Sequence, residues 1–260
     1  MKLNGSSQKQ VLMNNLVYER PYRVNTYEAD ASGRLSIPGL FNYLQDAAAR
    51  HATELKFGKE HLEQENRFWV LSRILLKIDT IPDWEEEIIL RTWPSGVDKL
   101  FALRDFEIIG LSGKKYGGAT SCWLMVSRQS RRPVRPGKLL EDINMEMQRD
   151  SSLDRYPSKL PGPVNHSYKS PVIPVRYSDL DINMHVNNVQ YIKWVIDTYP
   201  LDFILGNEIK SAEVNYLSES VPGDEITVHI SEMENKKFDN SIVRKNDDKE
   251  LCRLQLTWKT

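Results

Sequence analysis

Four polar side chains recur at every second position of the segment YSDLDINMHVNN, residues 177–188. They are Asp179, Asp181, Asn183 and His185. Carboxylate, amide and imidazole groups placed together can hold a metal ion, orient and deprotonate a water molecule, or form an ordinary solvated turn. The residues around this segment indicate which of the three alternatives applies.

Calcium binding is the first alternative, because the segment matches the first three oxygen-ligand positions of an EF-hand loop. The sixth position of such a loop should be glycine and is Met184, and the twelfth should be glutamate and is Gln190. Prolines in the preceding residues 171–174 exclude the entering helix. A single histidine also lacks the further nitrogen or sulfur ligands of a zinc site. We therefore predict neither a metal site nor a cofactor.

The residues after this segment have the pattern of a helix, from about Asn187 to Thr198, that is apolar on most sides. Such a helix is normally enclosed by other elements. The backbone N–H groups at its start can stabilise an oxyanion, since the donors and the helix dipole point toward it. The candidate donors are Val186, Asn187 and Asn188, and they favour acyl-group chemistry. The alternative is an asparagine-rich turn that only caps the helix.

The order of predicted elements occurs twice along the chain. A helix from Ser36 to about Phe57 precedes four strand-like runs, and the helix near residue 190 precedes four more. Residues 128–174 between them contain seven of the thirteen prolines and one short predicted helix near 141–147. We expect an α+β tandem hotdog fold, in which each unit is a long antiparallel sheet wrapped around a helix. Its parts are an N-terminal extension (1–20), a first unit (21–127), a linker (128–170) and a second unit (171–260).

Composition limits the function classes. The 260 residues are 40% hydrophobic and 27% charged, with a formal net charge of −1, so no overall basic field favours nucleic acid. No apolar run reaches the about 18 residues of a membrane-spanning helix, and the N-terminus has no secretory pattern. Cys122 and Cys252 are far apart in strand-like runs. We expect reduced thiols in a cytoplasmic protein.

The stretch YSDLDINMHVNNVQYIKWVID closely resembles the active-site region of the plant and bacterial acyl-ACP thioesterases. Three further stretches resemble motifs of that family in the same order: FWVLSRILLKID, RTWPSGVDKLFALRDFEI and GATSCWLMVSRQSRRPVRP. The resemblance extends from about Tyr22 to Trp258, and the family has a duplicated hotdog fold. It implies hydrolysis of fatty acyl thioesters on acyl carrier protein (ACP).

The resemblance also implies a catalytic set: Asp181, Asn183, His185 and Glu219. Glu219 matches the family pattern Tyr-x-x-Glu-Cys, but the last position here is Ser220. A thiolate nucleophile is therefore missing at that position, although a serine nucleophile stays open. We expect direct attack by water, which Glu219 deprotonates with His185 in a largely apolar cleft. Asn183 would orient the water or carbonyl, Asp181 would support the loop, and Asp179 would be a turn or cap residue.

By the same resemblance, the first unit contains the acyl tunnel. Its candidate lining residues are Leu40, Leu44, Trp69, Leu71 and Trp93, for each of which plain core packing is an alternative. Basic residues Arg128, Arg131, Arg132, Arg135 and Lys138 cluster in the linker. They are candidates for docking the acidic carrier protein, and a solvated loop is the alternative.

Three functions are compatible with the sequence. The first is an acyl-ACP thioesterase, the second an acyl-CoA thioesterase, and the third a hotdog protein that binds acyl groups without hydrolysis. Neither acyl chain length nor saturation preference follows from the sequence. A homodimer of the duplicated chain is a further possibility.

Overall fold

The structure, a computed structural model, describes residues 16–137, 150–162 and 166–259. Helix α2 (Ile37–Glu54) precedes β2 (Arg67–Ile78), β3 (Glu87–Asp98), β4 (Phe101–Gly110) and β5 (Lys115–Ser127). Helix α5 (Asn188–Ile196) precedes β9 (Ile209–Tyr216), β10 (Glu225–Glu232), β11 (Lys237–Arg244) and β12 (Lys249–Trp258). Shorter elements are β1 (Tyr18–Arg23), α3 (Lys59–Gln64), β6 (Pro133–Val134), β7 (Tyr168–Lys169), β8 (Ile173–Pro174), η1 (Tyr177–Asp179) and α6 (Leu201–Leu205). The expected repeat of one helix followed by four long strands is present.

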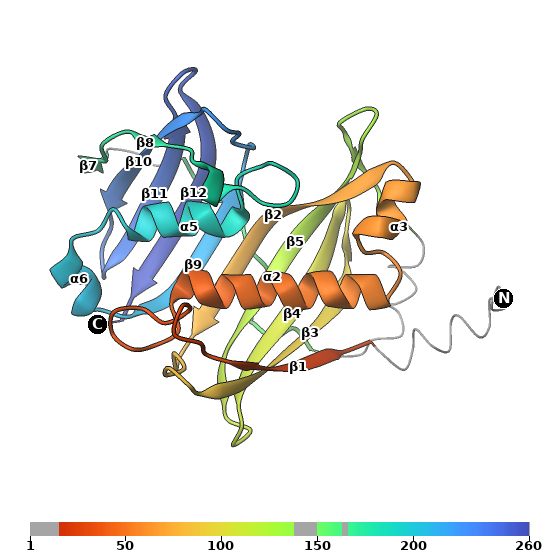
Figure 1. The fold of residues 1–260 in the computed structure, drawn as a ribbon, viewed down its shortest axis with the longest axis horizontal. Coiled ribbons are helices and arrows are strands. Elements are labelled where there is room, and N and C mark those ends of the chain that lie inside the picture. Colours follow the sequence, from red (N-terminus) through yellow and green to blue (C-terminus); the bar gives the residue numbers. More distant parts are fainter. Residues whose placement is uncertain (1–15, 138–149, 163–165, 260) are drawn as a thin grey trace, which may run out of the picture.

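All twelve described strands form one antiparallel sheet, in the order β1-β3-β4-β5-β2-β9-β12-β11-β10-β7, with β6 beside β5 and β8 beside β10. The two halves join where β2 pairs with β9, for example at Leu75 opposite Glu213. Helices α2 and α5 lie side by side on the same face of the curved sheet (Figure 1). This is the tandem hotdog fold, and the expected fold class is confirmed.

Both long helices bury their apolar faces against the sheet. Ser36 caps α2 by accepting a hydrogen bond from the Gly39 N–H at 3.1 Å, and Leu40 and Leu44 on its inner face are each 1% exposed. Ile192 and Val195 of α5 are completely buried. The enclosure expected for this apolar helix is therefore present. None of the helices in the described ranges is both long and apolar enough to cross a lipid bilayer.

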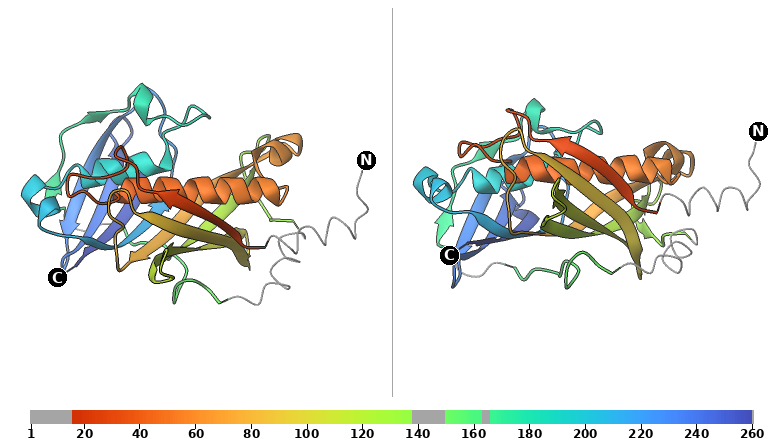
Figure 2. Two further views of the ribbon diagram at one scale, coloured as in Figure 1. Left: turned by 60° about the horizontal axis from the view of Figure 1, so that its bottom comes forward. Right: turned by 90° about the horizontal axis from the view of Figure 1, so that it is seen from below.

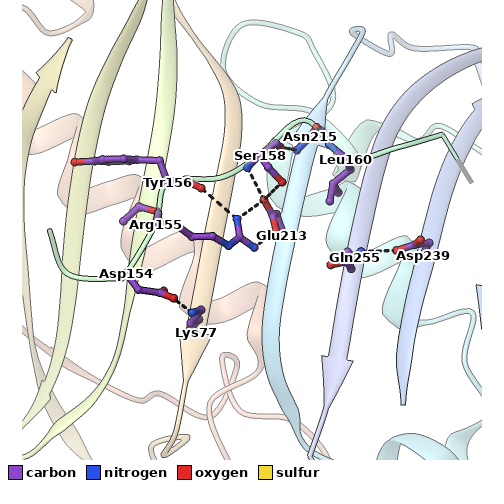
Figure 3. A network of polar contacts seen from close by, with 11 residues as sticks. Lys77, Asp154, Arg155, Tyr156, Ser158, Leu160, Glu213, Asn215, Asp239 and Gln255 are labelled. Atoms are coloured by element: carbon purple, nitrogen blue, oxygen red, sulfur yellow. Dashed lines mark hydrogen bonds and ion pairs between the residues drawn. The ribbon is translucent and has the colours of Figure 1, made fainter. Parts of the chain in front are cut away.

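Residues 150–162, called the strap here, cross the sheet on the face opposite the helices (Figure 2). Two buried carboxylates, Asp105 and Glu213, hold the strap on the two halves of the sheet, and Figure 3 shows the contacts of Glu213. Asp105 of β4 accepts hydrogen bonds from Ser152 N–H at 2.9 Å and from the Tyr156 hydroxyl at 3.1 Å. Glu213 of β9 accepts from Arg155 and Ser158. The strap is therefore bonded to both halves of the sheet, and the helix predicted near 141–147 lies outside the described residues.

Candidate active site

Asp181 organises the loop between η1 and α5. Its Oδ1 atom accepts hydrogen bonds from the backbone N–H groups of Asn183 at 2.7 Å and His185 at 3.2 Å. Its Oδ2 atom accepts from the Asn183 side-chain amide at 3.3 Å. One carboxylate thus bonds to the backbone of both other predicted catalytic residues of this loop and to the Asn183 amide, and its supporting role in catalysis stays a prediction.

His185 and Glu219 come together from separate loops. The His185 Nε2 atom lies 3.8 Å from the Glu219 Oε2 atom, and the two side chains are 35% and 47% exposed. This separation is longer than a direct hydrogen bond but lets both groups contact one water molecule. The carboxylate is half exposed, so the expected apolar enclosure of Glu219 is wrong.

The predicted oxyanion donors at the start of α5 are not equivalent. The Val186 N–H donates to the Ser220 carbonyl at 3.1 Å, and the Asn187 N–H donates to the Asp179 carbonyl at 2.8 Å. Both N–H groups already donate to backbone carbonyl groups of the protein. The expectation that Val186 and Asn187 offer free donors for an oxyanion is therefore wrong. Among the described residues, the Asn188 N–H has no acceptor. Because Asn188 is the first residue of α5, its N–H has no partner within the helix either. Of the three predicted donors, it is therefore the one that donates to no backbone carbonyl of the described residues.

Asp179 has a structural position. It is 7% exposed, and its Oδ2 atom accepts a hydrogen bond from the Arg176 N–H at 2.7 Å. Asn187 caps α5, accepting from the Val189 N–H at 3.0 Å. Within the described ranges, no three His, Cys, Asp or Glu side chains are arranged to hold a metal ion. The side-chain oxygen atoms of Asp179, Asp181 and Asn187 accept hydrogen bonds from N–H groups of this segment or of the residues directly beside it.

A narrow cavity begins at the start of α5 and lies between α2 and the sheet. It is lined by Phe41, Leu44, Gln45, Leu71, Ile74, Phe106, Trp123, Asn188, Val189 and Tyr216. Its volume of about 10 Å³ holds about one water molecule. Any group larger than a water molecule would need the lining side chains to move apart.

Two of the five predicted lining residues, Leu44 and Leu71, line this cavity. Leu40 and Trp93 lie in the core at 1% and 0% exposure, and the Trp69 indole N–H donates to the Phe57 carbonyl at 2.9 Å. None of these three lines this cavity. Phe41 and Gln45 were not predicted, although Leu44 and Gln45 follow Phe41 by three and four positions, which places both beside Phe41 on the helix surface.

Tyr216 is a further residue that the sequence analysis left without a role. Its hydroxyl group donates to the Asn188 carbonyl at 3.0 Å, which fixes the first residue of α5. The sequence contained a pattern that could have indicated this residue, since Tyr216 and Glu219 form the Tyr-x-x-Glu part of the family pattern.

The three nucleophilic side chains Ser220, Cys122 and Cys252 are buried. The Ser220 hydroxyl is fully buried and donates to Asp224 at 2.9 Å. Burial raises the pKa of the Cys122 thiol to about 11 and raises the pKa of the Cys252 thiol as well. Neither thiol is positioned or ionised for attack.

Replacing Ser220 with alanine should leave kcat for thioester hydrolysis within about twofold of wild type, because its hydroxyl bonds to Asp224. Loss of one buried hydrogen bond should lower the free energy of unfolding by about 1 kcal/mol. Steady-state kinetics and urea unfolding measure the two effects, and Ser218→Ala in the same loop is the control. A folded Ser220→Ala variant without activity would instead identify a serine nucleophile.

The predicted docking arginines lie in or beside the turn after β5. Arg128 forms an ion pair with Glu63 of α3 at 3.0 Å, and the guanidinium groups of Arg128 and Arg131 lie over the Phe68 ring. Arg132 and Arg135 are exposed, and Lys138 lies outside the described residues. Helix α3 also contacts the active-site loop, because the Lys59 ammonium donates to the Asn183 Oδ1 atom at 3.1 Å. The basic turn after β5 and the active-site loop therefore both contact α3.

The fold and this site define a tandem hotdog protein with a carboxylate–imidazole pair at the start of its second enclosed helix. The chain belongs to the acyl-ACP thioesterase family. The family model of the N-terminal domain matches residues 15–145, and that of the C-terminal domain matches residues 164–260.

Individual relatives of the chain support the same family assignment. The chain is 28% identical to a palmitoyl-acyl carrier protein thioesterase of Gossypium hirsutum, over 96% of this chain and 65% of the relative. It is 29% identical to an oleoyl-acyl carrier protein thioesterase of Arabidopsis thaliana, over 80% of this chain and 60% of the relative. A crystal structure of an acyl-ACP thioesterase from Bacteroides thetaiotaomicron superimposes with a TM-score of 0.82 at 28% identity, covering 95% of this chain and 99% of that one. The chain thus spans less than two thirds of these two plant relatives.

Proposed function

We propose that this protein is a thioesterase that hydrolyses fatty acyl-ACP to free fatty acid and ACP. The observation that carries this proposal is the His185–Glu219 pair, 3.8 Å apart, close to the helix start from which an apolar cavity leads inward. A thioester carbonyl bound at the Asn188 N–H would have its acyl chain in the cavity and its thiol side toward solvent.

The proposed reaction needs no covalent enzyme intermediate. Glu219, with His185, holds a water molecule and accepts its proton as the water oxygen attacks the thioester carbon. The Asn188 N–H donates to the resulting oxyanion, and the Asn183 amide orients the water or the carbonyl. Collapse of the tetrahedral intermediate breaks the carbon–sulfur bond, and the proton passes to the departing thiolate. The products are a carboxylic acid and the carrier thiol.

The proposed carrier is ACP, and acyl-CoA is the alternative. The two plant relatives are named for palmitoyl and oleoyl groups on acyl carrier protein. Arg128, Arg131, Arg132 and Arg135 lie in or beside the turn after β5, and that turn contacts α3 near the active-site loop. In this proposal, these arginines steer an acidic carrier toward the site.

The proposal includes a role for each of the two hotdog units and a cellular location for the protein. The cavity is lined mostly by α2, β2, β4 and β5, which supports an acyl-binding first unit (21–127) and a catalytic second unit (171–260). A cytoplasmic location and a homodimer stay predictions, and the two plant relatives are named as chloroplastic.

Free-thiol release from acyl-ACP and acyl-CoA of equal chain lengths tests the function. We expect hydrolysis of both, with a higher kcat/KM for acyl-ACP that falls as salt concentration rises. Equal, salt-independent values would favour the acyl-CoA alternative. Binding of acyl groups without hydrolysis of either thioester would favour a non-hydrolytic binding protein.

A further inference from the structure

Lys59 connects the first unit to a predicted catalytic residue of the second. Its Nζ atom donates a hydrogen bond to the Asn183 Oδ1 atom at 3.1 Å across 124 positions of sequence. Lys59 is the first residue of α3, whereas Asn183 lies in the loop before α5. The contact therefore joins parts of the chain that only the tertiary fold brings together.

The start of α3 is held in place. The Phe57 carbonyl accepts the Trp69 indole N–H at 2.9 Å, which ties the turn before α3 to β2. A Cβ atom at Gly58 would lie 2.5 Å from the Thr53 Oγ1 atom and 2.8 Å from the Thr53 Cα atom. Only glycine allows this close approach. Lys59 thus extends from a defined backbone position toward the active-site loop.

The chemistry of the two partners fixes which way the Asn183 amide faces. A lysine ammonium can only donate, and an ionised carboxylate can only accept. Lys59 therefore requires the amide oxygen on its side, and Asp181, whose Oδ2 atom accepts from Nδ2 at 3.3 Å, requires the amide nitrogen. A flipped amide would place its N–H₂ group against the ammonium and its oxygen against the carboxylate, and would lose both hydrogen bonds.

We propose that Lys59 is a positioning residue that acts through Asn183, by holding its amide in the one orientation suited to catalysis. The proposal rests on the proposed function, in which the free Nδ2 hydrogen and the remaining Oδ1 lone pair orient the water or the carbonyl. Asp181 and Lys59 hold opposite ends of the same amide, so each limits its rotation.

A double-mutant cycle tests this role. Lys59→Met removes the ammonium but keeps an unbranched side chain, and should lower kcat about 3- to 10-fold with little change in KM. In an Asn183→Ala background, the same substitution should change kcat less than twofold. Lys59→Arg, which keeps a donor and the charge, should recover most of the activity.

The substrate for this cycle is an acyl-pantetheine, which has neither a carrier protein nor a phosphate. The effect should persist, because it acts on the amide and not on the carrier. Lys56→Met, three residues earlier on an exposed position, is the control and should leave kcat unchanged. A loss seen only with acyl-ACP, or equal losses with and without Asn183, would overturn the proposal.

A second measurement is independent of turnover. The two side-chain N–H resonances of Asn183 in the full chain should shift and broaden in Lys59→Met and stay unchanged in Lys56→Met. If the wild-type protein hydrolyses no thioester, the proposed function fails, and these resonances still decide whether Lys59 orients the amide. Identical Asn183 spectra in wild type and Lys59→Met would contradict the inference.

Discussion

Glu219→Gln should hydrolyse acyl-ACP about 10²- to 10⁴-fold more slowly than the wild-type protein, with a similar KM. Glutamine has nearly the same shape as glutamate but cannot accept a proton from water at neutral pH, so it removes the proposed general base with little change in packing. Because the Glu219 side chain is 47% exposed, the substitution should not change the free energy of unfolding measurably. Steady-state thiol release at saturating substrate measures the effect.

Glu225→Gln is the matched control for this experiment. Its side chain is 44% exposed and forms an ion pair with Lys245, and it lies six positions beyond Glu219, at the start of β10. We expect its kcat to stay within about twofold of wild type, as for ordinary surface substitutions. Retained activity in Glu219→Gln would remove the general base from the mechanism, and loss in both variants would indicate a structural effect.

The local features of the site could be predicted because they are encoded in neighbouring residues. Asp181, Asn183 and His185 alternate along one short segment, and the apolar pattern that follows requires an enclosed helix. Asp181 bonds to the backbone of that segment within four residues, which is a local property of aspartate in turns. Glu219 was predicted as a site residue only from the family resemblance, because no local sequence pattern pairs it with His185.

Tertiary packing determined what the sequence could not show. Lys59 reaches Asn183 only because α3 returns to the active-site loop. The Val186 and Asn187 N–H groups are used by carbonyl groups of Ser220 and Asp179, and no pattern of side chains reveals those backbone partners. Leu44 lines the cavity but Leu40 does not, although both side chains are 1% exposed. Which inward-facing residue borders a cavity depends on how the opposing strands pack.

The contacts of the strap with the two halves of the sheet could not be predicted from the sequence either. The prolines of residues 128–174 predicted a break in the repeated pattern, but no sequence pattern predicted that the strap is bonded to both halves of the sheet. Its anchor Glu213 lies within β9, where a glutamate would ordinarily face solvent. The residue is 2% exposed because the strap covers it (Figure 3).

Arg155→Met should lower the free energy of unfolding by about 2–3 kcal/mol at neutral pH. Arg155 bonds to the Glu213 carboxylate at 2.9 Å and 2.5 Å, and its removal leaves a buried charge without its cation. Breaking a fully buried pair costs about 3–5 kcal/mol. We expect less here, because the Arg155 side chain is 44% exposed and water can reach its place. Urea unfolding measures the difference.

The matched control is Arg23→Met. Arg23 pairs with Glu85 at 3.5 Å, with both side chains more than half exposed, so its loss should change stability by no more than about 0.5 kcal/mol. Equal losses in the two variants would show that Glu213 does not depend on Arg155. Arg155→Met combined with Glu213→Leu should recover part of the loss, since no unpaired charge then stays buried.

The stability difference should also depend on pH. Burial alone raises the pKa of Glu213, but hydrogen bonds from Arg155 and Ser158 outweigh it and hold the pKa below its usual value. A lowered carboxyl pKa contributes stability above the unfolded value of about 4.3, and this contribution is lost as pH falls through the folded value. Unfolding curves of wild type and Arg155→Met should therefore differ most near neutral pH and converge only as the pH falls through the lowered folded pKa, since a protonated Glu213 needs no cation. A constant difference across this range would mean that Arg155 stabilises the strap through packing and not through the Glu213 charge.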